Sequence, residues 1–296
     1  MESNLKIAIV GFGFVGKAVS WGFTHKKVRQ YLVDPLLGKD ISSLDNVHPD
    51  IAFVCVPTPM SETGEIEPAL VVNTVKYLIE NTPALVVIKS TITPTVLKLI
   101  KMSLNHPGTM DRVVYNPEFL TENNANSDFA NPDLQVFGGN IVSCEQVAAA
   151  YDAYSICAPC RTYFVTHEEA SFIKYGINCY LASKVLWFNQ FSDIVEASGC
   201  SYDAVSTAMQ ADDRIGTSHM MVPGPDGKKG FGGACFAKDT AAFSHYSNEY
   251  FTVLDEVIAR NNEIRLQYPL DPREIAQSVT YKGKWWSTTN IVKIKS

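Results

Sequence analysis

Short apolar runs alternate with stretches of helical periodicity along the first half of the chain. Helical patterns, with apolar residues recurring every three or four positions, cover roughly residues 68–80 and 94–104. Strands that are separated by helices form parallel sheets, because each crossover between parallel neighbours needs a long connection. The pattern therefore predicts an α/β fold with a doubly wound parallel sheet. The five strand runs are residues 5–10, 28–34, 51–56, 84–90 and 112–115.

After residue 165 the pattern changes to helix alone. Thr166 and Glu169 have the spacing of a capping box, and helical periodicity then continues to Gly199, a residue suited to a helix C-terminus. Helical patterns return near residues 201–210 and 249–266. We therefore expect an all-helical central domain with one long helix after the sheet domain. The expected divisions are 1–165, 166–266 and a C-terminal tail, 267–296.

The first apolar run ends in the glycine-rich segment GFGFVG, with Gly11, Gly13 and Gly16 at the dinucleotide-binding spacing. The first glycine makes the turn, the second lets backbone amides meet a pyrophosphate, and the third lets the helix pack on the strand. Asp34 ends the second run, close to the ~20-residue spacing at which an acid bonds the ribose hydroxyls. An acid there repels a 2′-phosphate. These features predict a Rossmann-like domain that binds NAD in preference to NADP.

Polar residues follow three of the expected strands. Pro57 and Thr58 follow the third run, Ser90 and Thr91 end the fourth, and NPEFLTE follows the fifth. Ligands of such sheets bind beyond the carboxyl ends of the strands, so these residues are expected near one another. The glutamates of NPEFLTE, at 118 and 122, have an alternative interpretation as an exposed pair on one helical turn.

Composition narrows the class of protein. The formal net charge is −6 and no basic run occurs, which argues against nucleic acid as a partner. No stretch approaches the ~20 apolar residues of a membrane span, so we expect a soluble protein. Seven scattered cysteines without a secretory leader predict reduced thiols and a cytoplasmic location. Cys157 and Cys160 have redox spacing, but nearby ligands for a metal are missing, and no metal site is predicted.

Two candidate sites for chemistry lie in the second half. Lys174 and Asn178 are four residues apart on the long expected helix and so share a face, although a solvated lysine is the simpler interpretation. Cys235 follows two glycines in GFGGACFAKD and precedes Asp239 by four residues. Because glycine carries no side chain, a substrate or cofactor could approach the thiol closely.

The length of the expected helix also predicts that the chain forms a homodimer. At 1.5 Å per residue, about 33 residues span roughly 50 Å, which exceeds the size of a small domain. Part of its apolar face is therefore expected to pack against a second copy, giving a homodimer. The residues expected on that face are Phe172, Tyr180, Leu181, Val185 and Phe188.

Taken in order, these motifs resemble the UDP-glucose/GDP-mannose dehydrogenase family across residues 5–266. The segments that carry the resemblance are GFGFVG (11–16), CVPTP (55–59), KST (89–91), NPEFLTE (116–122), FIKYGIN (172–178), DRIG (213–216) and FGGACFAKD (231–239). The resemblance implies an NAD-dependent, metal-free oxidation of a nucleotide sugar's primary alcohol to a carboxylate in two hydride transfers. UDP-glucose is the first substrate that it suggests.

The resemblance also implies roles for individual residues. Cys235 would capture the intermediate aldehyde as a thiohemiacetal that is oxidised to a thioester, while Lys174 and Asn178 would donate hydrogen bonds to the oxyanion. Glu118 would activate water for thioester hydrolysis, and Thr91 and Asp239 would orient water or lysine. The implied NAD-binding residues are Gly11, Gly13, Phe14, Val15, Gly16, Asp34, Lys39, Val56, Pro57, Thr58, Ser90, Thr91, Glu122 and Lys238. The implied substrate-binding residues are Glu118, Phe119, Leu120, Lys174, Asn178, Arg214, Phe231, Gly232 and Gly233, with Arg214 reaching across the dimer.

Two departures from the family bear on the substrate. The family continues into a third domain that binds the nucleotide, and residues 267–296 are too few to form it. The segment between Arg214 and Cys235 is longer than usual and contains Lys228 and Lys229. We hypothesise that these lysines partly replace phosphate contacts of that domain.

Two other functions fit parts of the sequence. A β-hydroxyacid dehydrogenase would also combine a nucleotide-binding domain with helices that carry a lysine and an asparagine, but it makes one oxidation per turnover and needs no cysteine. A catalytically degenerate protein that binds NAD would need none of the chemical residues. The number of NADH formed per substrate separates these possibilities.

Overall fold

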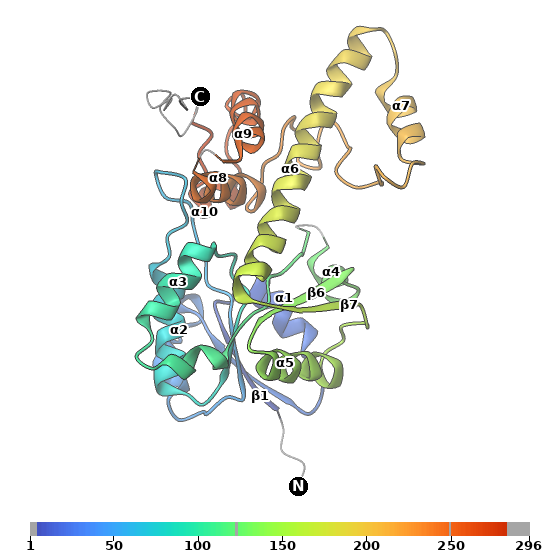
Figure 1. Ribbon diagram of the computed structural model, residues 1–296. Helices are drawn as coiled ribbons and strands as arrows, with labels where there is room; N and C mark the ends of the chain where they lie inside the picture. The colour runs from blue at the N-terminus through green and yellow to red at the C-terminus, as the bar shows by residue number, and fades with distance from the viewer. Residues whose placement is uncertain (1–4, 122–123, 249, 283–296) are drawn as a thin grey trace, which may run out of the picture. The chain divides into compact units, whose positions relative to one another are not determined.

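The computed structural model describes residues 5–121, 124–248 and 250–282 (Figure 1). The chain divides into two compact units. Unit 1 comprises residues 1–58 and 67–174, and unit 2 comprises residues 59–66 and 175–296. The helix α6 starts in unit 1 and continues into unit 2 from Tyr175.

Unit 1 is built on a seven-stranded sheet with the strand order β2-β1-β3-β4-β5-β6-β7. All neighbouring strands are parallel except β5 and β6, which pair antiparallel. The expected doubly wound sheet is therefore confirmed, with one antiparallel pair that the apolar pattern does not predict. The strands are β1 (Leu5–Val10), β2 (Val28–Val33), β3 (Ile51–Val54), β4 (Leu85–Ile88), β5 (Val113–Tyr115), β6 (Leu134–Gly139) and β7 (Arg161–Val165).

Helices cover the sheet of unit 1. Residues from α1, α4 and α5 share one apolar cluster with the inner strands, and its aromatic centre includes Phe23, Phe53 and Tyr151. The helices α2 and α3 contact each other, and α2 also contacts β3 and β4. The helices are α1 (Phe14–Gly22), α2 (Ala69–Asn81), α3 (Pro94–Ser103), α4 (Ala125–Ala130) and α5 (Ile141–Tyr154), with short 3-10 turns η1 (Pro35–Leu37), η2 (Ile41–Leu44) and η3 (Pro107–Arg112).

The long helix α6 runs from His167 to Ala197 (Figure 1). The expected capping box forms at its start, since Thr166 N donates to Glu169 Oε2 at 2.8 Å and Glu169 N donates to Thr166 Oγ1 at 3.2 Å. Gly199 has φ +75°, the left-handed conformation that ends many helices. Both ends of the helix therefore agree with the sequence prediction.

Unit 2 consists of helices packed on the later part of α6. Its apolar contacts join Phe188 on α6 to Tyr202 on α7, and Met60 to Ala241 on α8 and Val279 beyond α10. The helices are α7 (Tyr202–Met209), α8 (Phe236–Ser247), α9 (Thr252–Arg265) and α10 (Pro272–Ala276). Phe188 was expected on a dimer face, but it is buried inside this unit, so that assignment is wrong. No helix in the described ranges is long and apolar enough to cross a membrane.

Candidate active site

The glycine-rich turn between β1 and α1 has the geometry that dinucleotide binding requires. Gly11 has φ +92°, and a Cβ there would lie 2.6 Å from the carbonyl oxygen of Cys55. A Cβ on Gly16 would lie 2.0 Å from the carbonyl oxygen of Gly11, so this glycine lets α1 approach the turn. Gly13 is exposed, and a Cβ there would meet nothing within 4 Å. The open side at Gly13, next to the N-terminus of α1, fits a pyrophosphate.

Asp34 lies at the end of β2 beside this turn. One carboxylate oxygen accepts a hydrogen bond from Phe12 N at 2.7 Å, and the other accepts from Leu36 N at 2.8 Å. These bonds hold the carboxylate against the glycine-rich turn, where an acid would meet a ribose. Lys39 is exposed, and its backbone N–H bonds Asp34 O at 3.2 Å.

The ends of β3 and β4 are joined through buried hydroxyls. Thr58 Oγ1 donates to Thr91 O at 3.1 Å, and Ser90 Oγ donates to Val56 O at 2.6 Å. Pro57 is exposed between these buried residues. The structure thus brings together the polar ends of β3 and β4, as the sequence predicted.

Glu118 and Lys174, which are 56 residues apart in sequence, meet inside unit 1. Lys174 Nζ donates to the main-chain oxygen of Glu118 at 2.6 Å and lies 3.3 Å from Glu118 Oε1. The other carboxylate oxygen accepts from Leu120 N at 2.6 Å, and the ammonium lies 5.3 Å from the ring centre of Phe119. Both side chains are buried, with residue exposures of 8% for Glu118 and 2% for Lys174. A buried ammonium is therefore fixed on the loop that carries the candidate base.

A second buried lysine, Lys89 in KST, was not assigned a role from sequence. Its Nζ donates to Asn116 Oδ1 at 2.8 Å, and Tyr151 OH donates to the same oxygen at 3.0 Å. Asn116 Nδ2 donates to Val136 O at 2.8 Å, so the NPEF loop is anchored at its first residue. Burial lowers the pKa of Lys89 to about 8. The available signal in the sequence was a lysine placed directly after an apolar strand.

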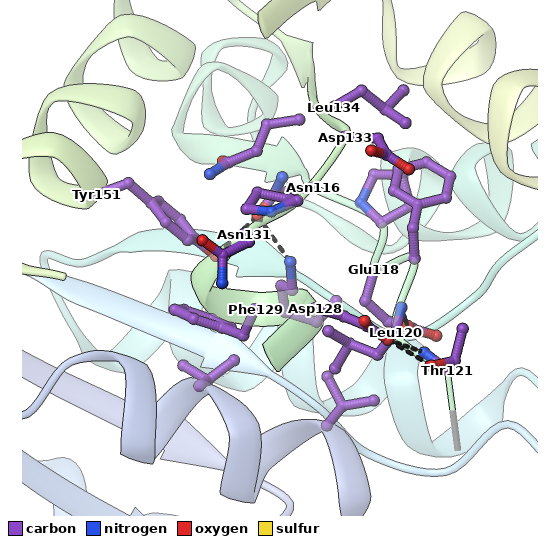
Figure 2. Close-up of a pocket in the computed structure, with 17 residues that line it drawn as sticks. Asn116, Glu118, Leu120, Thr121, Asp128, Phe129, Asn131, Asp133, Leu134 and Tyr151 are labelled. Carbon is purple, nitrogen blue, oxygen red and sulfur yellow. Dashed lines mark hydrogen bonds between the residues drawn. The ribbon is translucent and has the colours of Figure 1, made fainter. Parts of the chain in front are cut away.

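A cavity of about 170 Å³ lies in unit 1 beside this loop (Figure 2). Val15 of the glycine-rich segment and Lys89 line it, together with residues 116–121, part of α4, residues 131–135 and Tyr151. Figure 2 shows Tyr151 directed toward Asn116, and Thr121 bonded to Asp128. Glu118 and Leu120 belong to the same lining, so the cavity connects predicted cofactor-binding and predicted catalytic residues. Glu122 lies outside the described residues.

In unit 2, Asp239 joins two of the predicted residues. One oxygen of its carboxylate accepts from Asn178 Nδ2 at 2.6 Å, and the other is ion-paired with Lys238 Nζ. All three residues are buried, with exposures of 6% or less. Lys238 was expected to contact NAD, and in the structure its ammonium neutralises Asp239.

Cys235 is half-buried at the N-cap of α8, and its carbonyl oxygen accepts the backbone N–H of Asp239 at 2.8 Å. A helix N-terminus stabilises a thiolate, because its unpaired amides and dipole favour negative charge. Burial raises the pKa of Cys55 to about 12 and that of Cys144 to about 11, so these two thiols are poor nucleophiles at neutral pH. None of the seven cysteines forms a disulfide.

The remaining predicted residues of unit 2 lie on loops. The side chain of Arg214 is 89% exposed and forms a two-point contact with Asp212. Lys228 Nζ donates to Pro269 O at 2.6 Å, and Lys229 is ion-paired with Asp193, which raises the pKa of Lys229. Phosphate binding by the two lysines stays a hypothesis. Among the described residues no cluster of His, Cys, Asp and Glu could hold a metal ion.

Two domain models of one protein family match this chain. The NAD binding domain of the UDP-glucose/GDP-mannose dehydrogenase family matches residues 39–155, and the central domain of the same family matches residues 168–263. The chain belongs to the UDP-glucose/GDP-mannose dehydrogenase family. The gap between the two matches contains β7 and ends at the start of α6, and the resemblance drawn from the motifs is confirmed.

Individual members of the family match this chain over only part of their own length. A UDP-glucose 6-dehydrogenase from Rickettsia bellii is 33% identical over 239 residues, which are 79% of this chain and 54% of that protein. The chain therefore spans about half the length of the curated relatives that it matches.

Solved structures share the fold. A UDP-glucose dehydrogenase from Pyrobaculum islandicum has a TM-score of 0.70 at 24% identity, covering 88% of this chain and 69% of that one. A 3-hydroxyisobutyrate dehydrogenase from Mycobacterium tuberculosis has a TM-score of 0.62 at 16% identity, covering 82% of this chain and 86% of that one. Both likenesses concern the fold alone.

Proposed function

We propose that the chain is an NAD-dependent dehydrogenase that oxidises the primary alcohol of a nucleotide sugar to a carboxylate, with UDP-glucose as the first substrate to test. The observation that supports this most directly is the buried contact between Lys174 and Glu118. The two residues were selected separately from sequence, and an ammonium beside a candidate base is what the proposed chemistry needs. Family membership supports the same reaction class.

The NAD site of the proposal lies in unit 1. Gly11, Gly13 and Gly16 would admit the pyrophosphate to the N-terminus of α1, and Asp34 would meet the ribose. The hydroxyl-rich ends of β3 and β4 would form the adjoining wall. Two NAD molecules, bound there one after the other, would each accept one hydride, one for each oxidation.

In the first oxidation the alcohol carbon would lose a hydride to NAD and its hydroxyl would lose a proton to solvent. The ammonium of Lys174 and the amide of Asn178 would donate hydrogen bonds to the developing alkoxide, a kind of contact typically worth several kcal/mol. Asp239 would hold the Asn178 amide in place, because the two are already bonded at 2.6 Å. The product of this step is an aldehyde.

The second oxidation would proceed through Cys235. Its sulfur adds to the aldehyde carbon and the thiol proton passes to the carbonyl oxygen, which gives a thiohemiacetal. Loss of a hydride to the second NAD and of the hydroxyl proton to solvent would then turn this adduct into a thioester. Glu118 then takes a proton from water as the water oxygen attacks, the carbon–sulfur bond breaks, and Cys235 leaves as the thiol. This proposal requires the thiol, the Lys174 ammonium and the Glu118 carboxylate to surround one carbon.

Counting the products tests the proposal. The full chain with NAD and UDP-glucose is expected to form two NADH and one uronate per sugar consumed. Cys235→Ala should lose uronate formation, because the thioester cannot form, whereas Cys200→Ala should retain it, because Cys200 is an exposed thiol outside the proposed site. Uronate formation by Cys235→Ala at the normal rate would contradict the role of the thiol.

One structural observation favours a second candidate. The fold of 3-hydroxyisobutyrate dehydrogenase covers most of this chain, so a single oxidation of a β-hydroxyacid is the alternative. That reaction would yield one NADH per substrate and would survive Cys235→Ala. Binding of NAD without any NADH formation, across a panel of nucleotide sugars and hydroxyacids, would instead indicate a catalytically degenerate protein.

The proposal includes a homodimer. Tyr180, Trp187 and Ile194 are 63%, 52% and 65% exposed and recur every seven residues along α6. A row of exposed apolar side chains at this spacing suits packing against a second helix. Arg214, which is exposed on the loop after α7, is the residue proposed to reach the substrate of the other copy.

A further inference from the structure

The backbone just before Cys235 is held by buried side chains from three helices. Asn189 of α6 accepts from Gly230 N at 3.0 Å. Asn261 of α9 accepts from Phe231 N at 2.7 Å and donates to Phe231 O at 3.0 Å. The carboxylate of Glu274 on α10 accepts from Gly233 N at 3.2 Å. A segment rich in glycine would otherwise have many conformations, so these contacts define its path.

The side chain of Arg265, on α9, packs against the backbone of Gly230 and Gly232. It is 1% exposed, and its guanidinium bonds Asp226 at 2.8 Å and Glu274 Oε1 at 2.8 Å. A Cβ on Gly232 would lie 2.1 Å from Arg265 Nη2. Position 232 must therefore be glycine, because any side chain there would collide with the buried guanidinium. The sequence pattern alone does not show this constraint.

Glu274 is fully buried and uses both carboxylate oxygens. Oε1 accepts from Tyr281 OH at 2.6 Å as well as from Arg265 and Gly233, and Oε2 accepts from Asp271 N at 2.8 Å. Burial by itself would raise the pKa of this carboxyl, but the hydrogen bond from Tyr281 and the charge of Arg265 outweigh it and lower the pKa. We call Asp226, Arg265, Glu274 and Tyr281 the clamp.

Stability alone is a weak explanation for the clamp. Buried ion pairs gain little net stability over well-packed apolar residues, because desolvation offsets their attraction. Apolar side chains could fill the same space, but they could not accept a hydrogen bond from the backbone N–H of Gly233. The clamp therefore does something that a plain core would not do: it fixes a backbone position two residues before the thiol.

We propose that Glu274, supported by Arg265, is a positioning residue that holds residues 230–233 so that Cys235 occupies one fixed place at the start of α8. The importance of this place rests on the proposed function, in which the thiol attacks the aldehyde. The clamp itself is a property of unit 2. Its members come from the loop before Gly230, from the last residue of α9 and from residues 274 and 281, and none of these four residues was given a role from sequence.

The experiment compares the full-length wild type with Glu274→Gln. A glutamine offers one carbonyl oxygen in place of two carboxylate oxygens and leaves Arg265 with Asp226 as its remaining acidic partner in the clamp. We expect hydrogen exchange in the peptide containing residues 230–235 to become at least tenfold faster. We also expect the ratio of Cys235 to Cys200 alkylation by iodoacetamide, read by mass spectrometry, to rise at least threefold as the half-buried thiol opens.

The kinetic constants separate a local effect at Cys235 from a general loss of fold, because a local effect lowers kcat and leaves KM for NAD unchanged. Glu274→Gln should lower kcat at least tenfold while KM for NAD stays within twofold, because the proposed NAD site lies in unit 1. Glu263→Gln is the matched control: Glu263 is exposed on α9, where it pairs with Arg260, and all three readouts should equal those of the wild type.

Unchanged exchange and an unchanged alkylation ratio in folded Glu274→Gln would overturn the proposal. If that variant does not fold, Tyr281→Phe takes its place, since it removes one donor to Glu274 and keeps the ion pair. A smaller rise in both readouts then supports the clamp, and no rise rejects it. Exchange and alkylation need no turnover, so a wild type that forms no NADH would reject the proposed function while these two readouts still decide on the clamp.

Discussion

Lys89 shows how one buried group changes the pH dependence of the whole protein. Its ammonium is 7% exposed and hydrogen bonds to the neutral Asn116. The folded state therefore gives up this proton more readily than the unfolded chain does, where the pKa of a lysine is 10.5. A lowered lysine pKa means that stability is lost as pH falls through about 8 and is fully present above 10.5.

We expect the free energy of unfolding of the wild type to rise relative to that of Lys89→Met between pH 8 and 10.5. The size of the relative gain should be on the order of 3 kcal/mol, at about 1.4 kcal/mol per pKa unit. Urea unfolding at a series of pH values measures it. Lys101→Met, at an exposed site on α3, is the control and should show no such slope. A difference between wild type and Lys89→Met that does not change with pH would contradict the lowered pKa.

Individual residues also show where sequence reasoning stops. Glu118 and Lys174 were each selected from a motif, but no pattern indicates that residues 56 positions apart touch. Asp239 was expected to orient water or lysine, and in the structure its carboxylate accepts from Asn178 and is ion-paired with Lys238, two contacts that no sequence pattern indicated. Lys89 and Asn116 were quoted within motifs and given no role, because only the folded sheet brings Asn116, Lys89 and Tyr151 together.

At the scale of elements, the turn between β1 and α1 offers a matched pair of variants. A Cβ at Gly16 would collide with a backbone oxygen at 2.0 Å, whereas one at Gly13 would enter open space. We expect Gly16→Ala to destabilise the fold by about 1–3 kcal/mol or more, since overpacking forces the backbone to shift. Gly13→Ala should change stability by less than about 0.5 kcal/mol.

The same pair separates folding from binding. Under the proposed function, Gly13→Ala should weaken NAD binding roughly tenfold or more, about 1.4 kcal/mol, because its methyl group occupies the space of the pyrophosphate. Thermal unfolding and an NAD titration measure the two effects. Normal NAD affinity in Gly13→Ala would place the cofactor elsewhere.

Elements differ in how well the sequence predicts them. The parallel strands β1, β3 and β4 are buried on both faces and read as continuous apolar runs, and the capping box and Gly199 mark α6 at both ends. No helix or strand was predicted between NPEFLTE and α6, although α4, β6, α5 and β7 lie there. The residues of β7 lie at the sheet edge and are mostly exposed, and β6 ends in two glycines, so neither has the pattern of a buried strand.

At the scale of the whole molecule, the proposed dimer can be tested on α6. Trp187→Glu should convert a dimer into a monomer, because it places a charge at the centre of the row formed with Tyr180 and Ile194. Light scattering coupled to size exclusion measures the mass. Val253→Glu makes the same change at a residue of α9 that is 67% exposed, and should leave the mass unaltered. A wild type that is monomeric at all concentrations would reject the proposed interface.

The charges of the clamp also constrain how this chain can diverge. Arg265 carries one positive charge between the carboxylates of Asp226 and Glu274, so replacing it alone leaves the buried Glu274 carboxylate without its cation, at a cost of about 3–5 kcal/mol. Loss of Arg265 alone is then selected against, while joint replacement of Arg265 and Glu274 by neutral residues is tolerated. Descendants of a common ancestor should inherit these two residues together or lose them together, and a survey of such sequences would show the pair as one unit of inheritance.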